Sequence, residues 1–163
     1  MTQNKNNTTT SSEREFVMER IFNAPRKLVF EAYSDCKHLA HWWGPKDWTL
    51  PVCQMDFRPG GIWLYCMRGP DGMESWGKAT YREIIAPERI VYTDAFVDVE
   101  GNELEGMPEM LITMVFSEQD GKTKLTSRTQ FASAAELKAV LEMGMEQGFT
   151  ETLDRLEAYL AKA

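Results

Sequence analysis

The sequence contains few residues of the kinds that most often form a metal or catalytic site. Among 163 residues there are only two histidines. His38 and His41 could share one face of a helix, but a third metal ligand would have to be Asp35 or come from a distant segment. Glu83 and Glu109 could face inward, yet a solvated or paired carboxylate is the commoner state. The sequence therefore predicts no metal site, no cofactor and no catalytic set.

Cysteine is also scarce. Cys36, Cys53 and Cys66 are an odd number of thiols with long spacings, which fits neither a disulfide framework nor a zinc knuckle. In a reducing compartment such residues stay unpaired and pack as small apolar side chains. We therefore expect three free thiols.

An excess of positive charge and long apolar runs are missing as well. The 18 Lys and Arg residues are outnumbered by 25 Asp and Glu, which gives a net charge of −7 and argues against nucleic acid or anionic lipid as the main partner. The apolar runs are too short for a membrane-spanning helix. The first twelve residues lack the apolar segment of a secretory signal. These features predict a cytoplasmic protein with no nucleic-acid partner and no membrane insertion.

Apolar and aromatic residues are abundant enough for one substantial core. They make up 43% of the chain, and aromatic residues alone make up 11%. Residues 1–12 have no apolar side chain except that of Met1, so we expect a disordered polar tail. The remaining residues, 13–163, are expected to form a single domain.

The first half of this domain begins with a strand and two short helices. Apolar and charged residues alternate loosely over residues 13–22, which favours a strand. A helix is expected to start near Pro25. A second helix, capped by Ser34-Asp35, should end at Gly44-Pro45. Trp42 and Trp43 lie about 100° apart on a helix, so we expect one to be buried and the other to reach a cavity mouth.

Residues 49–131 alternate short apolar segments with turn sequences. The turns are expected at 58–61, 69–72, 86–88 and 119–122. Six strands in succession predict an antiparallel meander.

The period then changes to that of a helix. Residues 133–136 form a capping box, and the apolar spacing predicts one long helix over 134–161. Gly144 and Gly148 lie four residues apart in it. They indicate either a kink or restart after Met143, or a notch where a strand or ligand approaches. For the notch, we expect Gly148→Ala to be destabilising and Gly144→Ala to have a smaller effect.

A sheet that curls around this helix can leave a cavity between the two. The chain supplies five Trp, eight Phe, five Tyr and ten Met for its walls, although such side chains are also ordinary core residues. The side chains that we expect to line the cavity are Trp43, Trp63, Tyr65, Met67, Trp76, Tyr92, Met114, Met143, Gly148 and Phe149. A hydroxyl of Tyr65 or Tyr92 would supply a polar anchor.

Several motifs together resemble those of a known family. They are residues 23–30 (NAPRKLVF), 41–45 (HWWGP), 58–61 (RPGG), 67–72 (MRGPDG), 83–84 with 86–90 (EI and APERI), 123–131 (TKLTSRTQF) and 147–156 (QGFTETLDRL). The chain resembles the bacterial homologues of the activator of heat-shock-protein ATPase over residues 14–161, with Phe149 where the family often has Trp. That family belongs to the START-like (SRPBCC) superfamily.

The resemblance implies an α+β helix-grip fold, in which a first strand, two short helices and a six-strand meander wrap around a long C-terminal helix. It also implies an apolar small-molecule ligand, held without catalysis in a carrier, sequestration or stress-response role. Alternatives are a chaperone-associated interaction module or a polyketide cyclase-like enzyme. A chaperone contact and a homodimer are further possibilities that the resemblance leaves open.

Overall fold

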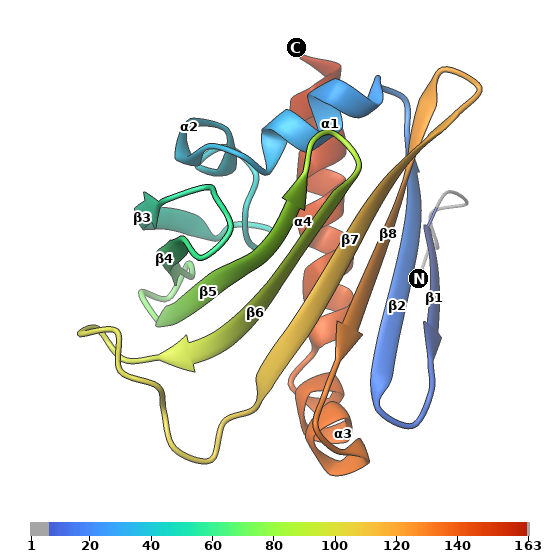
Figure 1. Cartoon of the computed structure of the whole chain (residues 1–163). Coiled ribbons are helices and arrows are strands. Elements are labelled where there is room, and N and C mark those ends of the chain that lie inside the picture. The colour runs from blue at the N-terminus through green and yellow to red at the C-terminus, as the bar shows by residue number, and fades with distance from the viewer. Residues whose placement is uncertain (1–6, 163) are drawn as a thin grey trace.

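The computed structural model describes residues 7–162, within which eight strands and four helices are found (Figure 1). The strands are β1 (Asn7–Ser11), β2 (Glu15–Phe22), β3 (Thr49–Met55), β4 (Ile62–Arg68), β5 (Glu74–Ile85), β6 (Arg89–Val97), β7 (Glu109–Gln119) and β8 (Lys122–Gln130). The helices are α1 (Arg26–Ala32), α2 (Cys36–Leu39), α3 (Ala134–Glu142) and α4 (Met145–Ala161).

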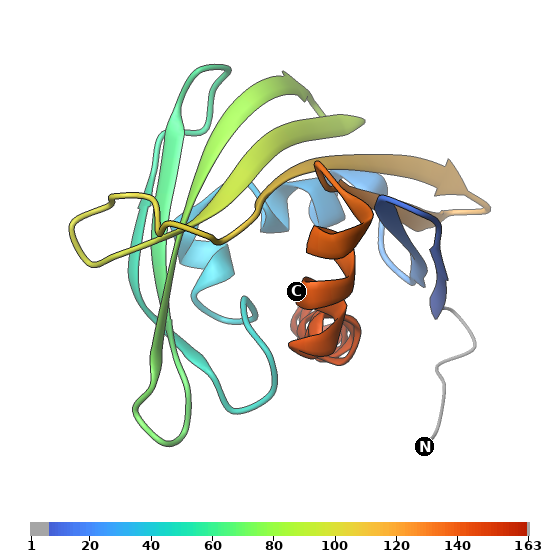
Figure 2. The same ribbon diagram turned by 90° about the horizontal axis from the view of Figure 1, so that it is seen from below.

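All strands belong to one antiparallel sheet with the order β1-β2-β8-β7-β6-β5-β4-β3. The six strands β3 to β8 follow one another as a meander, and β2 closes the order by pairing with β8. The sheet curls around α4, which lies on its concave face (Figure 2). The expected helix-grip architecture is therefore confirmed.

Alternation along the strands decides which side chains face the helix. On β2, the residues Phe16, Met18, Arg20 and Phe22 are buried, and their neighbours are partly exposed. This period of two directs one set of side chains into the concave face. None of the helices in the described residues is both long and apolar enough to cross a bilayer.

The expectation of a disordered tail over residues 1–12 is wrong for Asn7–Ser11. This segment forms β1, antiparallel to β2, with Thr9 opposite Met18. Three consecutive threonines favour extended backbone, and pairing satisfies the polar groups along an otherwise free edge of β2. Residues 1–6 lie outside the described residues.

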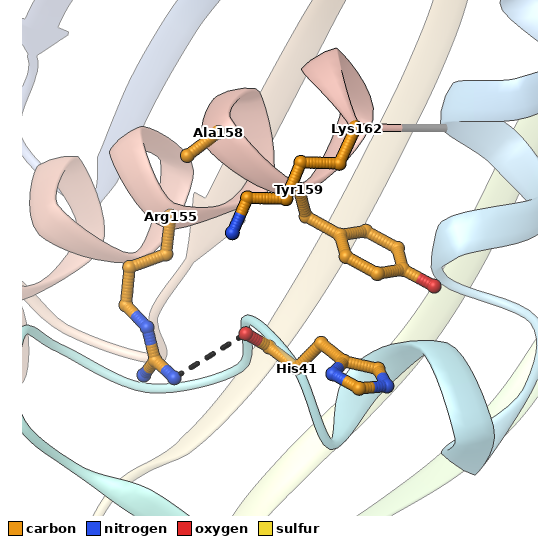
Figure 3. A pocket seen from close by; sticks show the side chains of 5 residues that line it. All are labelled: His41, Arg155, Ala158, Tyr159 and Lys162. Carbon is orange, nitrogen blue, oxygen red and sulfur yellow. Dashed lines mark hydrogen bonds between the residues drawn. The ribbon is translucent and has the colours of Figure 1, made fainter.

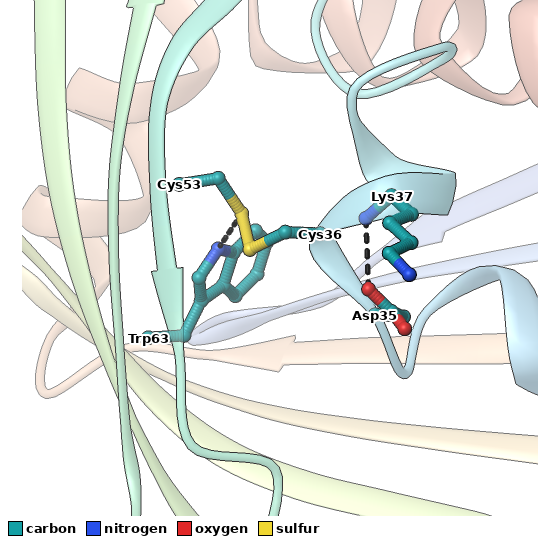
Figure 4. The surroundings of a disulfide bond; sticks show 5 residues. All are labelled: Asp35, Cys36, Lys37, Cys53 and Trp63. Atoms are coloured by element: carbon teal, nitrogen blue, oxygen red, sulfur yellow. Dashed lines mark hydrogen bonds between the residues drawn. A yellow bond between two sulfur atoms is a disulfide. The ribbon is translucent and has the colours of Figure 1, made fainter.

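The expectation of three free thiols is also wrong. Cys36, at the start of α2, is joined to Cys53 of β3 by a disulfide, with 5.9 Å between the two Cα atoms (Figure 4). The chain turns back after α2 and places β3 beside it, a proximity that a spacing of 17 residues does not reveal. The indole Nε1–H of Trp63 donates to the sulfur of Cys53 at 3.3 Å. Cys66 is a free, buried thiol.

The C-terminal helical segment is broken, contrary to the expectation of one continuous helix. Ser133 caps α3 by accepting a hydrogen bond from the backbone N–H of Glu136, as the capping box predicted. The helix ends at Glu142, and Gly144 has a φ of +92° before α4 begins. A left-handed residue cannot continue a right-handed helix, so the restart after Met143 is the correct alternative.

An arginine of the sheet fixes the position of α4. Arg20, whose side chain is 1% exposed, points from β2 toward the helix. Its Nη2 lies 2.6 Å from Asp154 Oδ1 and 3.2 Å from Glu157 Oε1, one helical turn further on. The helix buries Leu153, Leu156 and other apolar residues against the sheet beside this ion pair.

The two glycines of this region should respond to alanine with opposite signs. Gly144→Ala forces a side chain into the left-handed region and is expected to lower the free energy of unfolding by about 1–2 kcal/mol. At Gly148 a Cβ would meet only Pro45 Cγ, at an ordinary 3.5 Å. Gly148→Ala is therefore expected to raise the free energy of unfolding by about 0.5–1 kcal/mol, because alanine favours helix.

Urea denaturation of the two single variants measures both signs. The sequence suggested that Gly148→Ala would be the more destabilising of the two variants. The structure reverses this order, because the space beside Gly148 is not tightly filled. Destabilisation at Gly148 equal to that at Gly144 would contradict it.

Candidate functional site

An apolar cavity of about 320 Å³ lies between the concave face of the sheet, the chain turn at residues 42–45 and the α3–α4 segment. We call it the inner cavity. Its walls are mainly aromatic rings, aliphatic groups and methionines. The lining residues are Tyr33, Trp42, Trp43, Gly44, Pro45, Met67, Tyr92, Asp94, Phe96, Met110, Ile112, Met114, Thr129, Val140, Met143, Gly144, Met145, Gly148, Phe149 and Thr152.

The structure places most of the sequence-predicted residues on this wall. Those that line the inner cavity are Trp43, Met67, Tyr92, Met114, Met143, Gly148 and Phe149. They come from the turn after α2, from β4, β6 and β7, and from the α3–α4 segment. Their role in ligand binding stays a prediction.

Trp63, Tyr65 and Trp76 do not line the inner cavity. Trp63 and Tyr65 face the concave side, but the ring of Trp43 covers them, with centroid distances of 4.8 and 5.9 Å. Trp76 faces away, because the buried positions of β5 begin with its neighbour Gly77. A shift of one residue along a strand reverses the face, and the sequence does not fix that shift here.

Trp42 and Trp43 differ in burial, as expected, although both line the inner cavity. Trp42 is 0% exposed, and its Nε1–H donates to the carbonyl of Ala32 at 3.2 Å. Trp43 is half-buried and lies on the cavity wall. Within residues 7–162, its Nε1 is buried and has no hydrogen-bond acceptor. Trp43 therefore combines a place on the cavity wall with a buried N–H group that has no acceptor in that range.

Arg155 of α4 holds this turn in place. Its guanidinium donates to the carbonyl oxygens of Gly44 at 2.9 Å, Trp48 at 3.1 Å and Pro45 at 3.2 Å. These carbonyls belong to a segment with no regular secondary structure, so the arginine supplies donors that a helix or a strand would otherwise provide. The Pro45 carbonyl also accepts from the backbone N–H of Trp48 at 3.1 Å. The position of Trp43 thus depends on a side chain more than a hundred residues away.

Among the residues that the structure describes, Asp94 is the one carboxyl group on the wall of the inner cavity. It is 8% exposed, and the hydroxyl of Tyr65 donates to it, 2.9 Å from Oδ2 and 3.1 Å from Oδ1. Burial raises the pKa of Asp94 from 3.8 to about 7, although the hydrogen bonds from Tyr65 and the Ala95 backbone act in the opposite direction. The same burial, with the charge of Asp94 nearby, raises the pKa of Tyr65 and Tyr92.

Sequence reasoning missed Asp94. The available signal was the alternation of β6, where Ile90, Tyr92, Asp94 and Phe96 occupy every second position and share the concave face. The carboxylates that were considered, Glu83 and Glu109, are on the solvent side. Glu83 pairs with Arg89 at 3.1 Å, and Glu109 is exposed, as their commoner state predicted.

Gly77 of β5 makes the contact between Tyr65 and Asp94 possible. It lies opposite Tyr65 in the sheet, and a Cβ there would lie 2.8 Å from Tyr65 Cε2 and closer still to the hydroxyl end of the ring. The missing side chain leaves room for the tyrosine ring to cross the neighbouring strand.

A second, more polar hollow of about 520 Å³ lies on the outer side of α4. Its lining is His41, Arg155, Ala158, Tyr159 and Lys162 (Figure 3). The ring of His41 stacks on Tyr159, whose hydroxyl lies 2.6 Å from His38 Nδ1. Both histidines are thus engaged with one tyrosine, and Arg155 is engaged with the turn at residues 42–45. The inner cavity is the better candidate site, because its lining is mainly apolar and includes the buried core residues Trp42, Tyr92 and Met114.

The two tryptophans are expected to differ in their contribution to stability. Trp42→Ala empties a fully buried site and should lower the free energy of unfolding by about 3–5 kcal/mol. Trp43→Ala removes a half-buried side chain next to an existing cavity, so its cost should be less than half as large. Guanidinium denaturation of the two variants tests this division, and equal losses would contradict it.

Asp94 should make stability depend on pH. Because folding raises its pKa from 3.8 to about 7, the folded state binds the proton more tightly than the unfolded state. The resulting stabilisation is full below pH 3.8, falls as the pH rises toward about 7, and is lost above that. As the pH rises across this range, the free energy of unfolding of the wild type should fall by about 4 kcal/mol relative to that of Asp94→Asn. Urea denaturation at a series of pH values measures it, and a difference independent of pH would refute the assignment.

Comparisons with known proteins agree with this fold and its sequence motifs. Residues 23–161 match the family model described as Activator of Hsp90 ATPase homolog 1-like protein. A search of curated protein sequences finds no match.

Solved bacterial structures match nearly the whole chain. Protein Ms6760 from Mycobacterium smegmatis is 29% identical, with a TM-score of 0.85 over 94% of this chain and 97% of that one. A protein from Staphylococcus epidermidis is 32% identical, with a TM-score of 0.82 over 95% and 94%. A protein from Arthrobacter aurescens is 28% identical, with a TM-score of 0.87 over 96% and 92%. The match to the family model covers most of the sequence, and the chain therefore belongs to the Activator of Hsp90 ATPase homolog 1-like family.

Proposed function

We propose that this protein binds an apolar or aromatic small molecule in the inner cavity and does not transform it. The observation that carries this proposal is the cavity itself, about 320 Å³ in volume and walled by aromatic rings and methionines. Small-molecule sites are concave, mainly apolar and supplied with a few polar groups. The family fold supports a ligand-binding domain in general.

The walls combine rigid and adaptable parts. Tyr92 and Ile112 lie on central strands of the sheet, whereas Met143 and Met145 flank the helix break at Gly144. Methionine is flexible and polarizable, so it can follow the shape of different ligands. Met143 is 61% exposed and also lines the cavity, which places it at the rim. We therefore expect ligands of varied shape to enter beside the α3–α4 break.

Other roles suggested by the sequence stay predictions. They are a chaperone-associated module, a cyclase-like enzyme, a homodimer and a cytoplasmic location. The Cys36–Cys53 disulfide argues against a cytoplasmic location, because such bonds persist mainly in oxidising compartments. Within the described residues, no feature favours one of these roles over binding in the inner cavity.

The neutral fluorescent probe N-phenyl-1-naphthylamine tests the proposal. Gly148 lines the inner cavity, and a Cβ there would meet only Pro45 Cγ at 3.5 Å, so Gly148→Leu adds a large side chain at the site. It should weaken probe binding by about tenfold or more, since the cavity is small for a ligand site. Native mass spectrometry of freshly purified protein would show whether a small molecule copurifies.

The matched control is Ala158→Leu, which adds the same side chain to the outer face of the same helix. This control should leave the probe affinity unchanged. Loss of binding in Ala158→Leu but not in Gly148→Leu would place the site outside the inner cavity and overturn the proposal.

A further inference from the structure

We infer that the ligand of the inner cavity carries a protonated amine, which pairs with the carboxylate of Asp94. This inference rests on the proposed function and deepens it by naming the ligand class. The class is an amphipathic organic cation, with an apolar or aromatic body and one basic nitrogen.

The charge of the cavity wall is the first argument. Among the described residues, the lining includes one carboxyl group and no Lys, Arg or His side chain. The arginines that reach α4 are already engaged, Arg20 with Asp154 and Glu157, and Arg155 with backbone carbonyls. An ionised Asp94 therefore has no cationic partner among residues 7–162. Burying a carboxylate without a cationic partner costs free energy, and a cationic ligand would act as that partner.

The geometry around Asp94 is the second argument. The Tyr65 hydroxyl donates to the carboxyl group and orients it, while Gly77 leaves room for the Tyr65 ring. A carboxylate can accept about four hydrogen bonds, so Tyr65 and the Ala95 backbone leave acceptor sites open. An ammonium group has only donors, and it fits such a partner better than a hydroxyl does.

Aromatic rings beside the carboxyl group are the third argument. Tyr92 and Phe96 flank Asp94 on the same face of β6, and Trp43 and Phe149 complete the wall from the turn and from α4. The faces of such rings attract cations, most strongly where water is excluded. The net charge of −7 favours the approach of cations over anions. An anionic ligand would be repelled by the Asp94 carboxylate, and no cationic side chain of the described lining would offset that repulsion.

Three titratable groups face Asp94 from the sheet. They are Tyr65 of β4, Tyr81 of β5 and Tyr92 of β6, and burial raises the pKa of all three. The α3–α4 wall adds only uncharged side chains among the described lining residues. Asp94 is therefore the group of the cavity that changes charge near pH 7, and its ionisation should control amine binding.

A matched pair of ligands tests the inference. 2-(1-Naphthyl)ethylamine and 2-(1-naphthyl)ethanol share one ring system and differ in the cationic group. Each is titrated against the complex with N-phenyl-1-naphthylamine. In the wild type at about pH 8 the amine should displace the probe at about tenfold lower concentration than the alcohol, the size expected for a hydrogen bond to a charged group. This ratio should approach one when the pH falls to about 6 and Asp94 takes up a proton.

Asp94→Asn should abolish the preference for the amine. Glu109→Gln removes the same unit of charge from an exposed site on β7, so it should retain the preference. Should Asp94→Asn fail to fold, the pH dependence in the wild type remains a complete test. Equal displacement by amine and alcohol at about pH 8, with the probe bound, would overturn this inference alone. A preference that persists in folded Asp94→Asn would do the same, whereas failure of the probe and of both ligands to bind would overturn the proposed function as well.

Discussion

The attachment of one irregular chain turn to the C-terminal helix determines the shape of the candidate site. Arg155 donates from α4 to several carbonyl oxygens of the segment between α2 and β3, and so fixes the position of Trp43. On the opposite side, Arg20 of β2 pairs with Asp154 and Glu157 of the same helix. The helix is therefore held between the sheet and the turn, and its apolar residues cover only part of the concave face.

The uncovered part of the concave face explains the inner cavity. The eight-stranded sheet is wide, and a single helix cannot fill its curvature. The gap is lined by side chains, among them Trp43 from the turn and the methionines around Gly144. A wall of this kind can adjust to a ligand, while Asp94, Tyr65 and Gly77 stay fixed on the sheet. Adaptable shape and one fixed polar anchor are what a binder of related amphipathic molecules requires.

The sequence predicted the architecture because its signals were local. Turn residues separated the strands, Ser133 marked a helix start, and the resemblance to the family covered most of the chain. The features it did not reveal depend on long-range contacts. The Cys36–Cys53 pairing, the outward face of Trp76 and the burial of Asp94 each depend on which neighbours the fold supplies. For Asp94, the alternation of β6 carried the information, but only once the concave face had been assigned.

The indole N–H resonances of the tryptophans offer the most direct measurement of the central claim, that the inner cavity is the ligand site. In a ¹H–¹⁵N correlation spectrum, addition of 2-(1-naphthyl)ethylamine should shift the Trp43 Nε1–H signal, because the side chain that carries this group lines the cavity. The Trp76 signal should stay in place, because that side chain lies on the opposite face of the sheet. A shift of Trp76 without one of Trp43 would contradict the account.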